Sequence, residues 1–275
     1  MPRIYVINSQ GVMEAFSPKK VWRSARRAGA STFQAQKAVE EASRLVVEGM
    51  STQDVYNIIL GVLGKESPLV GMRLNLKKAI QALGPTGFPF EQYISSLWRF
   101  YDYKTQVGVM WKGKCVSHEV DIETRKDKDV QLVECKYRIQ AGGRVDLHDL
   151  MASWGYFYDI GLANASAHIH PLIMTNNKFT SEAIAYGECM GLNMIGWRYP
   201  KDRGLEYIIE SKKLYPVTIL PSFKGYLAEV LKARKILMVR ELLNTDIQQS
   251  IKGHHINQAT VDQLYKEAKL IVEGK

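Results

Sequence analysis

The spacing of hydrophobic residues divides the chain into a helical N-terminal part, a central part of alternating strands and helices, and a helical C-terminal part. Small and aliphatic residues recur every three or four positions over residues 33–48, which predicts an amphipathic helix. Residues 51–54 (STQD) predict the start of another helix, because they can cap its first turn. The turn-rich stretch 82–87 ends this part. We therefore expect three parts: residues 1–83, 84–215 and 216–275.

The central part predicts an α/β fold, because short strands alternate with amphipathic helices. Within this part, residues 145–159 predict a helix with a long hydrophobic stripe. We expect its buried face to consist of Leu147, Leu150, Met151, Trp154 and Tyr158. The expected order is a helix opening at Phe88, a strand over 105–111, a hairpin over 117–138, the helix 145–159, a strand over 168–174, a helix ending near Gly191 and a strand over 192–197.

The hairpin over 117–138 concentrates the candidate chemistry. If its turn is residues 126–129, Asp121 lies opposite Glu134, and directly opposed Cβ atoms are about 5 Å apart. Two carboxylates at that distance repel unless a proton or a cation lies between them, and Lys136 points to the same place. The plain alternative is a solvated sheet face with alternating charges.

These residues resemble a known nuclease pattern. Asp121 followed by Glu134-Cys135-Lys136 resembles the Asp…Glu-x-Lys core of restriction-endonuclease-like nucleases. The segment His118-Glu119-Val120-Asp121 is most similar to the Mrr-type catalytic domain. The resemblance covers about residues 84–200. It implies a mixed sheet flanked by helices and a DNA endonuclease that depends on Mg²⁺ or Mn²⁺.

The resemblance also implies roles for single residues. Asp121 and Glu134 would be metal ligands together with the carbonyl of Cys135, and Lys136 would orient the attacking water or stabilise the phosphorane. Glu91, near the start of the helix that opens at Phe88, would bind a second ion or position water. The alternative for Glu91 is a first-turn acid that the helix dipole favours.

Two further residues of the hairpin are secondary candidates. Glu119 lies on the same expected face as Asp121, and we expect His118 to be an orienting hydrogen-bond partner rather than a base. A non-catalytic DNA-binding or nucleotide-sensing module on a nuclease scaffold is the competing interpretation. An RNA nuclease remains a third one.

The N-terminal part resembles the ATP-cone, a small regulatory nucleotide-binding module. Strands are expected at 4–7 and 12–16, and Phe16, Lys20 and Val21 match the family's Phe-x-x-x-Lys-hydrophobic pattern. The resemblance implies that Lys19 and Lys20 contact the phosphates of ATP or dATP. Two departures, Asn8 and Gln10, replace charged residues of the family and leave nucleotide binding open. The same basic helix could instead follow DNA phosphates.

Charge favours a polyanionic partner. The net charge is +9; it is +6 over residues 1–86, zero over 87–215 and +3 over 216–275. No apolar run approaches the roughly 20 residues that span a bilayer, and the start has no signal-peptide pattern. We therefore expect a cytoplasmic protein that binds a polyanion such as DNA and no membrane. The resemblance to nucleases implies a role in restriction, defence or DNA processing, and a homodimer that cuts two strands. Residues 216–275 could serve packing, dimerisation or DNA contact.

Overall fold

The structure is a computed structural model, and it describes residues 3–140 and 142–274. The chain forms two compact units. The first unit contains Met1–Ala79, Ile219–Glu229 and Ile251–Lys275, and the second contains Ile80–Thr218 and Val230–Ser250. Each unit therefore combines segments that are far apart in the sequence. The three-part division expected from the sequence stays a prediction.

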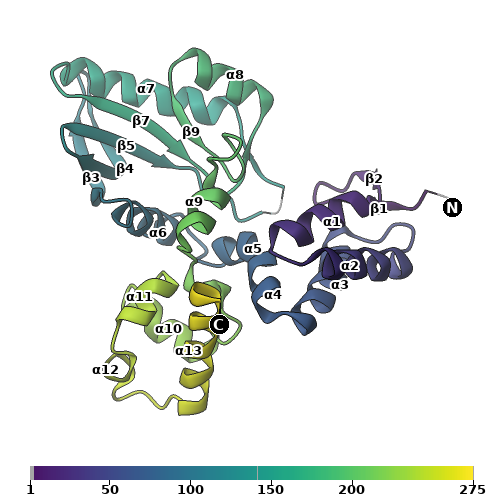
Figure 1. The fold of residues 1–275 in the computed structure, drawn as a ribbon. Coiled ribbons are helices and arrows are strands. Elements are labelled where there is room, and N and C mark those ends of the chain that lie inside the picture. The colour runs from purple at the N-terminus through teal and green to yellow at the C-terminus, as the bar shows by residue number, and fades with distance from the viewer. Residues whose placement is uncertain (1–2, 141, 275) are drawn as a thin grey trace. The chain divides into compact units, whose positions relative to one another are not determined.

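The N-terminal segment of the first unit is a two-stranded antiparallel hairpin followed by helices (Figure 1). Serine residues begin four of its helices: Ser17, Ser51 and Ser67 accept a hydrogen bond from the backbone of the first turn, and Ser31 forms a full capping box with Gln34. The elements are β1 (Tyr5–Ile7), β2 (Met13–Ala15), α1 (Pro18–Arg27), α2 (Thr32–Leu45), α3 (Thr52–Glu66), α4 (Pro68–Leu74) and α5 (Leu76–Gln81).

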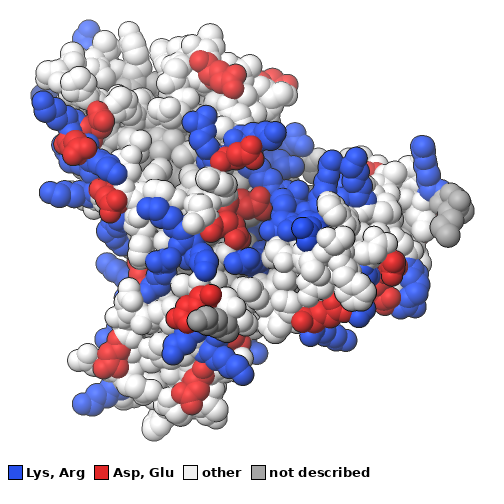
Figure 2. Space-filling view, in the orientation of Figure 1, with Lys and Arg blue, Asp and Glu red and all other residues white. Residues whose placement is uncertain are grey.

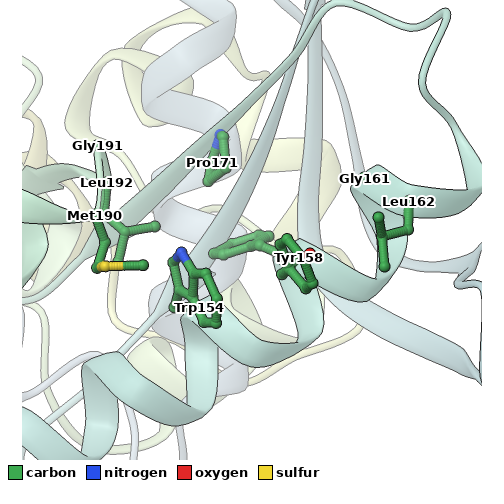
Figure 3. Close-up of a pocket in the computed structure, with 9 residues that line it drawn as sticks. Trp154, Tyr158, Gly161, Leu162, Pro171, Met190, Gly191 and Leu192 are labelled. Carbon is green, nitrogen blue, oxygen red and sulfur yellow. The ribbon is translucent and has the colours of Figure 1, made fainter.

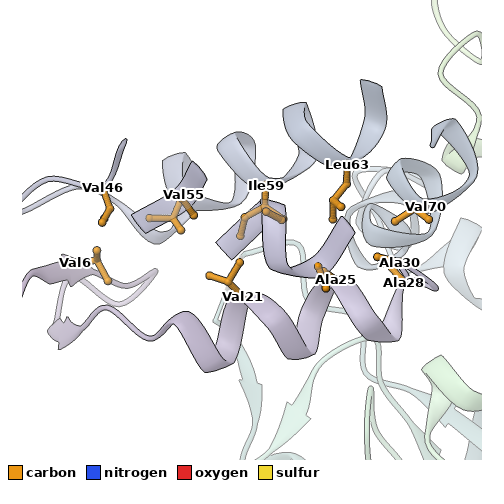
Figure 4. Close-up of a cluster of buried hydrophobic side chains, with 13 residues drawn as sticks. Val6, Val21, Ala25, Ala28, Ala30, Val46, Val55, Ile59, Leu63 and Val70 are labelled. Atoms are coloured by element: carbon orange, nitrogen blue, oxygen red, sulfur yellow. The ribbon is translucent and has the colours of Figure 1, made fainter. Parts of the chain in front are cut away.

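Alanine and valine make the core of this unit. Ala25 of α1 and three alanines of α2 have no exposed surface, and Val55, Ile59 and Leu63 of α3 cover them (Figure 4). Small side chains let helices approach closely, so the buried area per residue is modest but the packing is tight. The last helix, α13 (Gln258–Glu273), belongs to the same unit, where its buried Glu267 accepts hydrogen bonds from the backbone and hydroxyl groups of Ser222.

The second unit is built on one five-stranded mixed sheet, as the α/β prediction requires. Its strand order is β3-β4-β5-β7-β9, with β3, β4 and β5 antiparallel and β5, β7 and β9 parallel. Helix α7 covers one face of the sheet and α6 lies on the other (Figure 1). The elements are α6 (Phe88–Arg99), β3 (Lys104–Lys112), β4 (Ser117–Lys126), β5 (Asp129–Cys135), β6 (Arg144–Val145), α7 (Leu147–Ala163), β7 (Ile169–Met174), β8 (Lys178–Phe179), α8 (Ser181–Cys189), β9 (Asn193–Ile195) and α9 (Leu205–Lys212).

The remaining elements come from the C-terminal segment, which the two units share. They are η1 (Val217–Ile219), α10 (Gly225–Ala233), α11 (Val239–Asn244) and α12 (Ile247–Ile251). Just before this segment, the buried hydroxyl of Tyr93 in α6 donates to the carbonyl of Leu214 over 2.6 Å, a contact within the second unit. The helices and the five-stranded sheet confirm the α/β class expected from the sequence. The relation of the chain to the ATP-cone and to restriction-endonuclease-like nucleases stays a prediction.

The buried face of α7 differs from the expected one. Met151 is 48% exposed and Tyr158 is 54% exposed, whereas Phe157 and Ile160 are buried together with Leu150. The reason is that α7 is apolar almost all round, so the sequence pattern alone does not fix the rotation of the helix on the sheet. This rotation decides which α7 side chains reach the hairpin.

The expected register of the hairpin is observed where the two strands pair. The turn lies between Lys126 and Asp129, and the ladder ends at the pair Ile122↔Val133; Asp121 and Glu134 are the next residues of each strand, just beyond the last pair. On the other edge of β4, the two residues between the pairs Val107↔Ile122 and Val109↔Val120 are Gly108 and Asp121. Gly108 has a φ of 66°, which bends β3 next to Asp121.

Candidate active site

Asp121 and the end of β5 form the centre of the candidate site. The carboxylate Oδ2 of Asp121 accepts a hydrogen bond from the backbone N–H of Cys135 over 2.7 Å. This contact fixes the side chain across the strand end, one residue after Glu134 and one before Lys136. The thiol of Cys135 is buried, and burial raises its pKa well above its ordinary value, so the sulfur is kept as a neutral thiol.

Glu134 is held from two sides. The ammonium Nζ of Lys136 lies 2.5 Å from its Oε1, and the hydroxyl of Tyr156 donates to its Oε2 over 2.6 Å. The side chains of Lys136 and Glu134 are 19% and 15% exposed, so the pair is partly shielded and yet open to solvent. Burial and the charge of Glu134 raise the pKa of the Tyr156 hydroxyl far above its usual range, which keeps it a donor.

The carboxyl of Asp121 is the most perturbed acid of this cluster. Burial is the largest cause, and the charge of Glu134 adds to it, so that its pKa rises from 3.8 to about 7. The hydrogen bond from the Cys135 N–H and the charge of Lys136 act in the opposite direction. Two acids that a single lysine does not fully compensate favour a bound proton or a bound cation.

The acid on α6 is a neighbour of this cluster. Burial first, and then the charges of Glu134 and Glu119, raise the pKa of Glu91 above its ordinary value. Glu91 is therefore in electrostatic contact with both strands of the hairpin. Gly87 makes room for it, because a Cβ on Gly87 would lie 3.2 Å from Glu91 Oε1. Glu119 itself is exposed, and its Oε1 approaches the bend at Gly108.

His118 forms a hydrogen bond with Asp159 of α7 and not with Asp121 or Glu134. Its Nε2 lies 2.8 Å from Oδ2 of Asp159, and its ring is 5.8 Å from the ring of Tyr156. Asp159 also accepts hydrogen bonds from the backbone N–H groups of Cys115 and Val116. The hydrogen bond with His118, followed by those backbone groups, holds the pKa of Asp159 well below its usual range. The His118–Asp159 pair thus connects β4 to the helix that presents Tyr156.

A buried amide fixes the chain just after Lys136. Asn176 accepts from the backbone N–H of Arg138 and donates to its carbonyl, each over 2.8 Å, and Asn176 has no exposed surface. The guanidinium of Arg138 in turn contacts Asp149 on the first turn of α7. Both ends of the Lys136–Arg138 segment are therefore anchored, since the N–H of Lys136 bonds to the carbonyl of Met174.

The four residues expected from the resemblance lie within electrostatic reach of one another: Asp121, Glu134, Lys136 and Glu91. Three further residues that hold this cluster in place were not expected from the sequence: Tyr156, Asp159 and Asn176. A signal for the first two was present: they are three positions apart on an apolar helix and so share one face. Asn176 carried no such signal, because its role depends on a loop that returns from another strand.

The donor set fits a hard divalent cation. In the described ranges 3–140 and 142–274, no three His, Cys, Asp or Glu side chains are arranged to hold a metal ion together. Mg²⁺ does not need such a cage, because it is commonly bound by one or two carboxylates, waters and substrate phosphate oxygens. Asp121 and Glu134 supply two carboxylates. The pKa of Asp121 is raised first by burial and then by the charge of Glu134, and a bound cation would favour the ionised form against both.

The first unit holds a separate cavity of about 310 Å³ at the hairpin and α1. Its lining includes Lys20, whose Nζ is 3.0 Å from Oε1 of Glu14, and the aromatic rings of Phe16 and Tyr56. Asn8 also lines it, but its Oδ1 accepts from the backbone N–H groups of Gln10 and Val12 and so holds the β1–β2 turn. Lys19 is exposed on α1 and is not among the lining residues.

A second cavity, of about 260 Å³, lies on the outer side of the sheet unit (Figure 3). Trp154 and Tyr158 of α7 stack there, with ring centroids 4.9 Å apart, opposite Pro171 and the loop Met190–Leu192. Its lining side chains are apolar apart from the hydroxyl of Tyr158 and the indole N–H of Trp154. Without acids or bases, this cavity offers none of the chemistry found on the hairpin.

Comparisons with known proteins leave the function open. No protein-family model matches the chain. An uncharacterized protein of Archaeoglobus fulgidus is 29% identical over 175 residues, which is 62% of this chain and 95% of that protein. A crystal structure of a protein of unknown function, AF1548, is similar with a TM-score of 0.57 and 25% identity over 69% of this chain and 100% of that one.

A crystal structure of the protein VC1899 from Vibrio cholerae also matches, with a TM-score of 0.31, 15% identity, and coverage of 65% of this chain and 52% of that one. Among the described residues, every helix is too short or too polar to cross a membrane. The chain is thus similar, over more than half of its length, to an archaeal protein whose role is not known.

Proposed function

We propose that this protein is a divalent-metal-dependent DNA endonuclease that hydrolyses phosphodiester bonds. One observation supports the proposal most: Asp121, in the middle of β4, lies close to Glu134 and Lys136 at the end of β5, and burial and the charge of Glu134 raise the pKa of Asp121 to about 7. A solvated sheet face would leave its acids at their ordinary pKa values. Clusters of this kind concentrate at functional sites.

In this proposal Asp121 and Glu134 hold Mg²⁺ or Mn²⁺, with the carbonyl of Cys135 as a further oxygen donor. When bound, such an ion neutralises charge on the phosphate and makes a coordinated water more acidic. Glu91 lies on α6 within electrostatic reach of Glu134, so it can accept a proton from an attacking water or orient it.

Lys136 supplies the positive charge of the site. Its ammonium is fixed by Glu134, whose second oxygen is held by the Tyr156 hydroxyl, so the cation needs no reorganisation when negative charge develops on phosphorus. In the reaction the water oxygen forms a bond to phosphorus, one phosphorus–ester oxygen bond breaks, and the leaving oxygen takes up a proton. Lys136 is the donor of positive charge nearest to both acids.

Plasmid cleavage tests the proposal. The protein is incubated with supercoiled plasmid in Mg²⁺, in Mn²⁺ and in EDTA, and nicked and linear products are measured. We expect cleavage with either metal ion, and a loss of at least about 10²-fold in Glu134→Gln and Lys136→Ala. Asp127→Asn is the matched control, because Asp127 is an exposed acid of the same hairpin whose φ of 54° suits asparagine. Equal activity in all variants contradicts the proposal and favours a non-catalytic DNA-binding module.

The cavity of the first unit supports a second function, regulation by ATP or dATP. Lys20 offers a cation at its edge, and Phe16 and Tyr56 offer rings against which a base can stack. The salt bridge from Lys20 to Glu14 must open for the ammonium to meet a phosphate. We expect ATP to bind and to change the plasmid cleavage rate; a rate and a melting temperature that do not respond to millimolar ATP or dATP would contradict this role.

A further inference from the structure

The outer face of α1 is strongly basic and has no role in the proposed hydrolysis. The helix contains five basic residues and no acid, and its buried face is Val21 and Ala25, with Ala28 following at the C-cap. Figure 2 shows Lys and Arg side chains gathered over α1. Basic helices are common on solvated surfaces, so only the arrangement of the charges on α1 can indicate whether the helix binds a ligand.

Three of the cations and one indole form a single stripe. Lys19, Trp22, Arg23 and Arg26 are at positions i, i+3, i+4 and i+7, which share one side of a helix opposite the buried residues. The stripe extends over about 10 Å at 1.5 Å per residue. One DNA strand carries a phosphate about every 3.4 Å of the duplex axis, so this length faces about three phosphates.

The cations of the stripe are not neutralised within the part of the chain that the structure describes. Lys19 and Arg23 have no carboxylate at ion-pair distance there, whereas Lys20, beside the stripe, pairs with Glu14 at 3.0 Å. The guanidinium of Arg26 lies 5.9 Å from the centre of the Trp22 ring and donates to the carbonyl of Ala30. Trp22 remains 38% exposed, an aromatic surface between cations.

We propose that this stripe binds the phosphate backbone of DNA. Arginine and lysine side chains in a row on one face, with a partly exposed ring among them, are the features by which proteins hold nucleic acid without reading its sequence. The inference rests on the proposed function only for the choice of DNA over RNA. Lys20, which lines the nucleotide cavity, is not part of the stripe.

The test is binding without cleavage. Lys19→Ala/Arg23→Ala/Arg26→Ala is compared with Lys65→Ala/Lys266→Ala/Lys269→Ala, which removes the same charge from exposed positions of the same unit. Alanine keeps the helices intact, and circular dichroism verifies this. Fluorescence anisotropy with a labelled 30-base-pair DNA duplex in EDTA is measured from 50 to 200 mM KCl, and an RNA duplex of equal length is the second probe.

Loss of three phosphate contacts lowers the slope of log affinity against log salt by about 2.7, which is a loss of about 10²–10³-fold in affinity at 0.1 M salt. We expect this loss on DNA for the stripe variant and less than about threefold for the control variant. An unchanged slope, an equal loss in both variants, or a loss confined to the RNA duplex overturns the inference. Because EDTA removes divalent metal ions, the outcome is independent of whether the hairpin cleaves DNA.

Discussion

Asp121→Asn should stabilise the metal-free protein by an amount that grows as the pH rises from about 4 to about 7. In the folded chain the carboxyl of Asp121 has a pKa of about 7, because it is buried and lies beside Glu134. An unfolded aspartate titrates near 3.9. Between these values the folded state keeps a proton that the unfolded state has lost, so the free energy of unfolding falls as pH rises from about 4 to about 7.

The size of the effect follows from the same shift. A rise in pKa from 3.8 to about 7 corresponds to about 4 kcal/mol of destabilisation at pH 8, and relaxation of the two carboxylates reduces it to about 2–4 kcal/mol. Asparagine keeps the oxygen that accepts from the Cys135 N–H and offers its amide to Glu134, so no hydrogen bond need be lost. Its charge no longer changes with pH.

The assay is thermal or urea unfolding in EDTA at pH 4 and pH 8. We expect Asp121→Asn to lie close to the wild type at pH 4, where Asp121 is protonated in the folded state and largely protonated in the unfolded state, and to melt roughly 5–10 °C higher at pH 8. Added Mg²⁺ should then raise the melting temperature of the wild type at pH 8 more than that of the variant, because only the wild type has both carboxylates. A variant less stable than the wild type at pH 8, or an equal difference at both pH values, refutes the reasoning.

Three further changes test the surroundings of the site and the nucleotide cavity. Tyr156→Phe should lower the free energy of unfolding by about 1.5–3 kcal/mol in urea titrations and reduce plasmid cleavage, because it removes the hydrogen bond to the Glu134 carboxylate. The hydrogen bond with His118 lowers the pKa of Asp159, so ionised Asp159 stabilises the fold fully above about pH 4 and progressively less at lower pH. Asp159→Asn should abolish this pH-dependent stabilisation, and melting curves from pH 3 to pH 7 measure the loss. Lys20→Ala should weaken ATP binding at least about tenfold in calorimetric titrations, because a charged hydrogen bond to phosphate is removed.

Each of these expectations has an opposing result. Unchanged urea stability and cleavage in Tyr156→Phe would mean that the hydroxyl does not hold Glu134. A pH profile of Asp159→Asn parallel to that of the wild type would mean that the acid gains nothing from His118. Wild-type ATP affinity in Lys20→Ala would mean that Lys20 does not contact the phosphates.

Register was the part of the site that the sequence could predict. The charged turn at residues 126–129 fixes the pairing of β4 with β5, and with it the position of Asp121 relative to Glu134. Two-residue periodicity then directs Lys136 to the same side as Glu134. Such local rules need no knowledge of the rest of the fold.

The contribution of α7 could not be predicted in the same way. Apolar residues occur on both sides of the helix, so hydrophobicity does not decide whether Tyr158 or Phe157 is buried. Packing on the sheet decides it, and Tyr156 reaches Glu134 as a result. Likewise, the contact of Asn176 with Arg138 depends on how β5 pairs with β7. Ile169, where β7 begins, is 34 positions after Cys135, where β5 ends.

The most direct test of the central claim is a Mn²⁺ titration followed by electron paramagnetic resonance. The account requires the Asp121–Glu134 carboxylate pair to be a divalent-cation site, so the wild type and the control Asp127→Asn should bind Mn²⁺, while Asp121→Asn and Glu134→Gln should bind it at least about tenfold more weakly. Mg²⁺ should displace the bound Mn²⁺. Equal binding by all four proteins, or none by the wild type, would contradict the account.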